Sequence, residues 1–189
     1  MTAFLKPVEV TNQGTYRPTP TNARFDSLML PYNEQAERRW VRDTIGKTFL
    51  DALKAARTPN TINYNSFLGA IQPAFADPDL ENLFLNEGLY QLMAISSVFE
   101  ALPYIHFQVT SQGVQVNNTE FSTPGTGSDM RYVRDQMTNT LQFWQKEIVN
   151  FLCENQDIYI PLGFDPEGIC ATCHKNNDAS RNNGFFMIY

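Results

Sequence analysis

A seven-residue repeat of large apolar side chains constrains the fold of this chain more than any other feature. Four such residues recur at that interval: Met130, Met137, Trp144 and Phe151. Because this spacing brings the four side chains onto one face of a helix, it predicts a single helix over about residues 128–155. A helix of about 26 residues is roughly 40 Å long, so its apolar face needs another helix of similar length to pack against.

Two further long helices are predicted from their end signals. The first spans about residues 33–57, since Asn33 is a residue type that caps helix N-termini. The second spans about residues 79–102. It follows an Asp-Pro-Asp motif that begins at Asp77, and it is expected to end where Pro103 interrupts the helical pattern.

After Pro103 the apolar period changes from helical spacing to alternation. The alternating residues are Ile105, Phe107, Val109, Val114 and Val116, and Ser111-Gln112-Gly113 forms the turn between them. This pattern predicts a β-hairpin near residues 104–117. The expected fold class is therefore mainly α: a helical bundle of three long helices with a β-hairpin insertion, a core over residues 33–155, and two ends that lie outside it.

The two ends have loop chemistry but carry apolar residues. Four prolines in residues 1–32 predict an extended N-terminal arm, and residues 156–189 are expected to form a loop-rich tail. Apolar side chains at chain ends are costly in water, so we expect them to bind partner chains or, as the alternative, to dock on their own core. The partner-binding candidates are Phe4, Leu5, Phe185, Phe186, Met187 and Tyr189.

Composition favours protein partners over nucleic acid or membranes. The chain has 189 residues, of which 42% are hydrophobic but only 18% charged, so one domain with a largely neutral polar surface is expected. The net charge is −6, and no basic cluster exceeds the pair Arg38 and Arg39. No apolar run approaches the length of a membrane span, and residues 1–9 do not resemble a signal peptide. We therefore expect assembly in a reducing cytoplasm.

The three cysteines leave several interpretations open. Cys170-Ala171-Thr172-Cys173-His174 has the form that attaches c-type haem, but haem attachment normally follows export, for which no signal is visible. A structural zinc ion is the second possibility, with ligands Cys153, Cys170, Cys173 and His174. The third is three unligated thiols, which we favour, so we expect no metal and no cofactor. A small zinc-binding module that uses the C-terminal cysteines remains the alternative function.

No constellation of catalytic residues is visible in the sequence. His106 and His174 are the two histidines, and neither accompanies a recognisable nucleophile motif. Gly46-Lys47-Thr48 imitates the end of a phosphate-binding loop, but Val41 stands where that loop needs a glycine. We therefore expect no catalytic residues and no enzyme activity, while a small cytoplasmic regulator or an enzyme of unrecognised type stays open.

Three segments together resemble a known family. They are R-W-V-R-D-T-I-G-K-T-F-L-D-A-L at residues 39–53, L-M-A-I-S-S-V-F-E-A-L-P-Y-I-H-F-Q-V-T-S-Q-G-V-Q-V at 92–116, and F-L-C-E-N at 151–155. The pattern, which covers roughly residues 33–155, resembles the head-tail connector or ring (adaptor) proteins of crAss-like and related tailed bacteriophages. The segment with the two cysteines and His174 departs from that pattern.

The resemblance implies a structural virion subunit at the head-tail interface. Such a subunit forms a homo-oligomeric ring, typically of twelve copies, beneath the portal protein and contacts other connector or tail proteins. DNA passes through the channel without specific binding, which an acidic balance suits. The implied subunit has no active site, does not contact a membrane, and is assembled into the virion in the host cytoplasm.

Overall fold

The computed structural model describes residues 3–12, 23–57, 74–110, 113–116, 127–167 and 169. Its elements confirm the mainly α class. They are α1 (Pro7–Asn12), α2 (Ala23–Ala36), the π-helical turn η1 (Glu37–Val41), α3 (Arg42–Ile45), α4 (Lys47–Ala56), α5 (Pro78–Leu85), α6 (Leu89–His106), β1 (Phe107–Thr110), β2 (Gly113–Val116), α7 (Gly127–Glu154), α8 (Gln156–Tyr159) and the 3-10 turn η2 (Ile160–Leu162).

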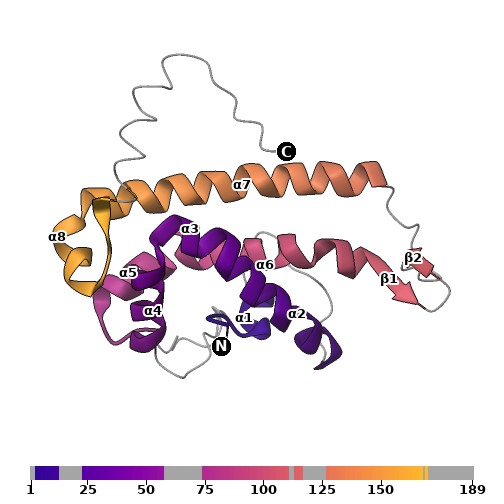
Figure 1. Cartoon of the computed structure of the whole chain (residues 1–189), viewed down its shortest axis with the longest axis horizontal. Coiled ribbons are helices and arrows are strands. Elements are labelled where there is room, and N and C mark those ends of the chain that lie inside the picture. Colours follow the sequence, from indigo (N-terminus) through magenta and orange to yellow (C-terminus); the bar gives the residue numbers. More distant parts are fainter. Residues whose placement is uncertain are drawn as a thin grey trace, which may run out of the picture.

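Helix α6 lies at the centre of the fold. It contacts α1, α2, η1, α5 and α7, and all its side chains from Leu92 to Ala101 are buried. Figure 1 shows α7 running antiparallel to α6 along one side, with α2 on the other side. A helix that is apolar all round can be stable only in such a central position.

The long helix predicted over residues 128–155 is confirmed by α7. Its seam residues Met137, Leu141 and Ile148 are buried, and Trp144 and Phe151 pack against the core at partial exposure. The seven-residue spacing identified this element because each seam residue contributes burial on the same face. No helix in the described part of the chain is both long enough and apolar enough to span a membrane.

The helix predicted over residues 79–102 is wrong in two respects. It is divided into α5 and α6 at Gly88, whose φ is +89°. Helix α6 also continues through Pro103 to His106. A proline inside a helix costs about 3 kcal/mol, which the burial of several large side chains on α6 outweighs. The predicted start is confirmed, because the Asp77 carboxylate accepts hydrogen bonds from the backbone N–H groups of Asp79 (2.9 Å) and Leu80 (3.3 Å).

The helix predicted over residues 33–57 also has different boundaries. Helix α2 begins ten residues earlier and continues through Pro31, and the helical path is interrupted at Gly46. Asn33 does not cap a helix end: its side chain is buried and donates a hydrogen bond to the backbone oxygen of Leu5 (3.1 Å). Gly46 has φ 81° and ψ 156°, a conformation that only glycine adopts readily, which explains the break between α3 and α4.

The two strands β1 and β2 pair antiparallel within the range 104–117. Phe107 lies opposite Val116, and Thr110 lies opposite Gly113. Figure 1 shows this pair at the end of the molecule where α6 finishes and α7 begins. The pair therefore connects the two long antiparallel helices.

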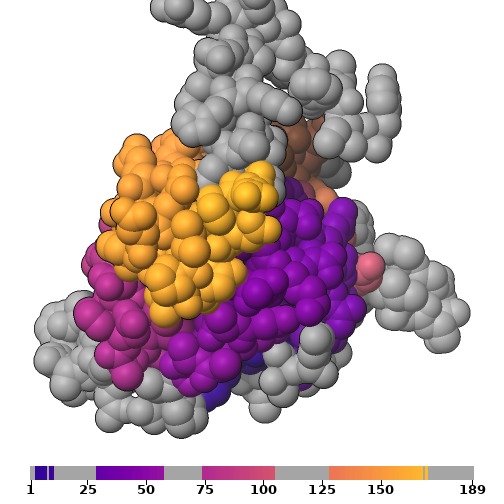
Figure 2. Space-filling view, turned by 60° about the vertical axis from the view of Figure 1, so that its left-hand side comes forward, coloured from indigo at the N-terminus to yellow at the C-terminus, as the bar shows by residue number. Residues whose placement is uncertain are grey.

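Both ends of the chain depart from the predicted arm and tail. Residues 7–12 form α1 in place of extended backbone, since Pro7 occupies the first helical position, where its missing N–H is not needed. At the other end, α8 and η2 fold back so that Tyr159 and Phe164 are buried against Phe49. Figure 2 shows this C-terminal segment, in yellow, lying against the violet surface of residues 29–57. The core therefore extends beyond residue 155.

Candidate assembly surfaces

The N-terminal candidates Phe4 and Leu5 lie in the chain's own core. Their exposed fractions are 5% and 3%, and the Phe4 ring packs on Phe75 and Phe84 at centroid distances of 6.1 and 5.6 Å. The Phe4 backbone N–H donates to the Glu37 carboxylate (2.8 Å). In the structure, therefore, Phe4 and Leu5 dock on the chain's own core, and neither side chain is exposed to a partner chain.

A buried ion pair holds the N-terminal segment in place. Glu9 is completely buried and pairs with Arg57 at the end of α4. The Arg57 guanidinium also lies over the Phe4 ring, 4.6 Å from its centroid, and the Tyr90 hydroxyl donates to the backbone oxygen of Glu9. A buried carboxylate is stable only when it is paired and hydrogen-bonded, so these contacts fix residues 3–12 against α4 and α6.

A second buried carboxylate, Glu100, connects α6 to η1. It accepts hydrogen bonds from Gln35 (2.8 Å), Arg39 (3.1 Å) and the indole N–H of Trp40 (2.9 Å). Sequence reasoning did not identify Glu9, Glu37 or Glu100 as buried. A signal for Glu100 was present, because it is the one charged residue in the apolar run that α6 buries.

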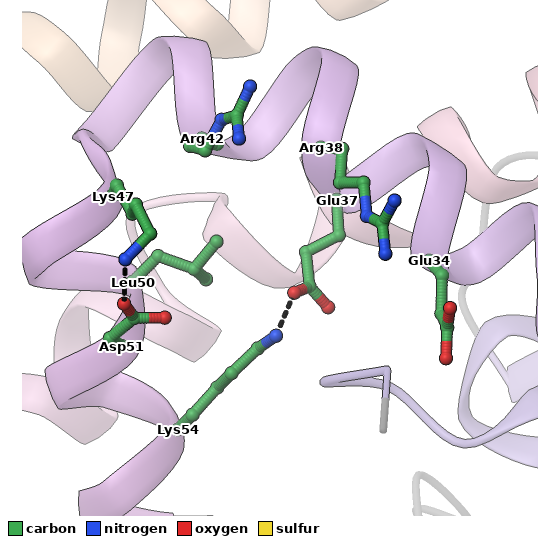
Figure 3. A pocket seen from close by; sticks show the side chains of 8 residues that line it. All are labelled: Glu34, Glu37, Arg38, Arg42, Lys47, Leu50, Asp51 and Lys54. Atoms are coloured by element: carbon green, nitrogen blue, oxygen red, sulfur yellow. Dashed lines mark hydrogen bonds and ion pairs between the residues drawn. The ribbon is translucent and has the colours of Figure 1, made fainter. Parts of the chain in front are cut away.

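A groove lies between α2, η1 and α3 on one wall and α4 on the other. Its volume, counting the part open to solvent, is about 460 Å³, and its lining residues are Glu34, Glu37, Arg38, Arg42, Lys47, Leu50, Asp51 and Lys54. Figure 3 shows Lys54 reaching across the groove to Glu37, and Lys47 paired with Asp51 on α4. The groove carries four cations and three carboxylates, a net charge of +1 in a chain whose net charge is −6.

Two guanidinium groups of this groove are unpaired. Arg38 and Arg42 are exposed and have neither an ion-pair nor a hydrogen-bond partner among the described residues. They stand four residues apart, so they project from the same side of the helical path. Planar guanidinium groups bind carboxylates in pairs of hydrogen bonds, which makes this wall suited to an acidic partner surface.

An acidic face is formed by the N-terminal end of α5 and the turn between α5 and α6. Asp77, Asp79 and Glu87 lie near the hydroxyl of Tyr159, which donates to the backbone oxygen of Asp79 (3.1 Å). Burial of Tyr159, and then the negative charges of Asp79, Glu87 and Asp77, raise the pKa of its hydroxyl to about 12. Within the described part of the chain, none of these three carboxylates pairs with a lysine or arginine.

A protein-family model matches residues 41–172, the greater part of the chain, and its description is "Family of unknown function (DUF6712)". The chain belongs to this family. No curated protein and no solved structure matches it. The DUF6712 match contains the acidic face, Tyr159 and the α4 wall of the groove, whereas Arg38 lies just before it.

The cysteine candidates are divided by the DUF6712 boundary. Cys153 and Cys170 lie inside the matched range, and Cys173 and His174 lie outside it. The structure places the Cys153 sulfur in a disulfide, so the expectation of three free thiols is wrong for this residue. A disulfide sulfur is also not the thiolate that zinc needs. Cys170, Cys173 and His174 lie outside the described residues, as do the tail candidates Phe185, Phe186, Met187 and Tyr189.

Exposed apolar side chains gather at the surface of several helices. The large ones are Leu30, Tyr104, Tyr132, Val133, Phe143, Ile158 and Ile160. Tyr104 stacks on Tyr32 at 4.9 Å, and burial, with a smaller contribution from Tyr104, raises the Tyr32 pKa above its usual value. Sequence reasoning assigned the apolar binding surface to the chain ends, but the structure adds these helix positions to the possible contacts.

Proposed function

We propose that this chain is a structural virion subunit, a head-tail connector that forms a ring between the portal vertex and the tail. The observation that carries the proposal is the order of elements from residue 39 to 155. A central apolar helix leads into a pair of antiparallel strands and then into a long antiparallel helix, an order that supports the pattern implied by the resemblance of the quoted segments. In this proposal α2 to α4, α5 with α6, and α7 form a bundle of three long helical segments with the hairpin as an insertion.

The surface supports the same role. Large apolar side chains such as Leu30 on α2 and Tyr104 on α6 are about half exposed, which suits burial against neighbouring chains. The net charge of −6 suits a channel wall that DNA passes without adhering. In the proposed particle about twelve copies form one ring, which contacts the portal protein on one side and other connector or tail proteins on the other.

Electron microscopy of the purified chain, alone and mixed with a portal protein from the same genome, tests the proposal. The expected result is a ring that stacks coaxially on the portal. Mass spectrometry of purified virions should detect the chain in a fixed ratio to the portal protein. A chain that stays monomeric with the portal and is absent from virions would refute the connector role.

A further inference from the structure

We propose that copies of this chain join head to tail, with the acidic face of one copy docked on the basic groove of the next. This contact rests on the proposed function, because it is the contact that would repeat around the ring. The groove is the one defined by Arg38, Arg42 and α4, and the acidic face is formed by Asp77, Asp79 and Glu87. The occupant of the groove is therefore a second copy of this chain.

Both surfaces carry charged groups that have no counter-charge in the described part of the chain. In the groove, Lys54 and Lys47 already pair with Glu37 and Asp51, whereas Arg38 and Arg42 have no partner in the described part of the chain. These two guanidinium groups therefore offer donors to an incoming acid. Figure 3 shows both side chains without a bonded neighbour among the residues drawn.

The acidic face has a complementary excess of negative charge. Asp79 is exposed and Asp77 and Glu87 are partly exposed, and no cation among the described residues neutralises them. The three carboxylates lie close enough to the Tyr159 hydroxyl that their charges, after its burial, help to raise its pKa. Two surfaces of opposite excess charge attract, and the attraction also fixes the register in which they meet.

The two surfaces are formed by different segments of the chain. Figure 2 shows the magenta surface of residues 74–104 beside the violet surface of residues 29–57, with the orange and yellow C-terminal elements above them. A contact between two different surfaces is heterologous, and such contacts generate a ring when the rotation between successive copies closes. The proposed contact is therefore of the type that a ring requires.

Charge reversal in the full chain tests the contact. One variant carries Arg38→Glu and Arg42→Glu, and the other carries Asp79→Lys and Glu87→Lys. Each should weaken self-association, measured by sedimentation velocity at low salt, by about tenfold or more. An equimolar mixture should restore assembly, because the reversed groove then meets the reversed face and each native surface meets its native complement.

Matched controls separate this contact from a change in net charge. Arg131→Glu with Lys146→Glu, and Asp135→Lys with Glu147→Lys, make the same charge changes at exposed positions on α7. These variants should assemble like the wild type. Added salt should weaken wild-type assembly and restore it in neither reversed variant. Melting curves show whether each variant is folded. If one is not, the milder Arg38→Gln with Arg42→Gln replaces the groove variant, and Asp79→Asn with Glu87→Gln replaces the acidic-face variant.

The outcomes distinguish this contact from the connector role. Wild-type oligomers that persist in both reversed variants, or α7 controls that dissociate equally, would overturn the contact while the ring proposal stands. A wild-type chain that is monomeric at low salt would overturn the contact as well. The connector role fails separately, through absence of the chain from virions.

Discussion

Replacing Gly88 with alanine tests the packing of α6 against α7 more directly than any other single change. Gly88 is buried between α5 and α6, and its φ of +89° is one that side-chain-bearing residues rarely adopt. A Cβ at this position would overlap the indole ring of Trp144 on α7. The positive φ costs about 1–2 kcal/mol, and the forced shift of a packed ring costs about 1–3 kcal/mol more. Gly88→Ala should therefore lower the free energy of unfolding by about 2–5 kcal/mol.

Gly163→Ala is the matched control for this experiment. Gly163 also has a positive φ, +98°, but the nearest side-chain atoms to its Cβ are 3.7 Å away, at Ala52 and Thr48. Gly163→Ala should lower the free energy of unfolding only by the cost of a positive φ in alanine, about 1–2 kcal/mol. Urea unfolding followed by circular dichroism measures both variants. Equal losses in the two variants would refute the reasoning, because they would show that no ring occupies the space beside Gly88.

A double-mutant cycle isolates the clash with the ring. Trp144→Ala removes the indole, so Gly88→Ala should cost less in that background than in the wild type, with a coupling of about 1 kcal/mol or more. Strict additivity would indicate that the strain at Gly88 comes from the backbone alone.

The remaining predictions concern buried ionisable groups. Arg57→Met should destabilise the chain by about 3–5 kcal/mol in urea unfolding because it leaves Glu9 buried without its cation. Adding Glu9→Gln to this variant should recover part of the lost stability. A double variant whose loss of stability equals the sum of the two single losses would contradict the pairing. Glu100→Gln should cost about 1–3 kcal/mol through its three hydrogen-bond donors, against almost nothing for the exposed Glu147→Gln. The pKa of Tyr159 is raised from 10.0 to about 12, so its contribution to stability is complete below pH 10 and is lost as the pH rises from 10 to 12. Relative to Tyr159→Phe, the wild type should lose up to about 2–3 kcal/mol of its free energy of unfolding across that range. Parallel pH profiles of the two proteins would contradict the raised pKa.

Part of the candidate site could have been read from the sequence. The Asp-Pro-Asp motif at Asp77 identifies the start of α5, and with it two carboxylates of the acidic face, because helix capping is a local interaction. Tyr159 joins that face only through the folding of α8 against α5, which no local pattern encodes. The groove likewise needs α3 and α4 to change direction at Gly46, and a single glycine in a helical pattern does not distinguish a tolerated residue from a break.

The ends of the chain illustrate the same division. Their prolines and apolar residues indicated that they would not form ordinary helices in isolation, yet residues 7–12 are helical and Phe4 and Leu5 are buried. From the sequence alone, the apolar residues at the ends could pack either on a partner chain or on the chain's own core. The choice depended on whether Glu9 and the Phe4 amide would find Arg57 and Glu37, which lie tens of residues away along the chain.

The sequence by itself determined the mainly α class, the full extent of α7 and the start of α5, because periodic burial and capping act over a few residues. Only the tertiary structure decided that α6 continues through Pro103, that α2 begins before Asn33 and that the helical path breaks at Gly46 and Gly88. Local helix preferences differ by up to about 1 kcal/mol for most residues and by about 3 kcal/mol for proline, and burial of a few large side chains exceeds these differences. Packing therefore overrode the local signals wherever the two disagreed.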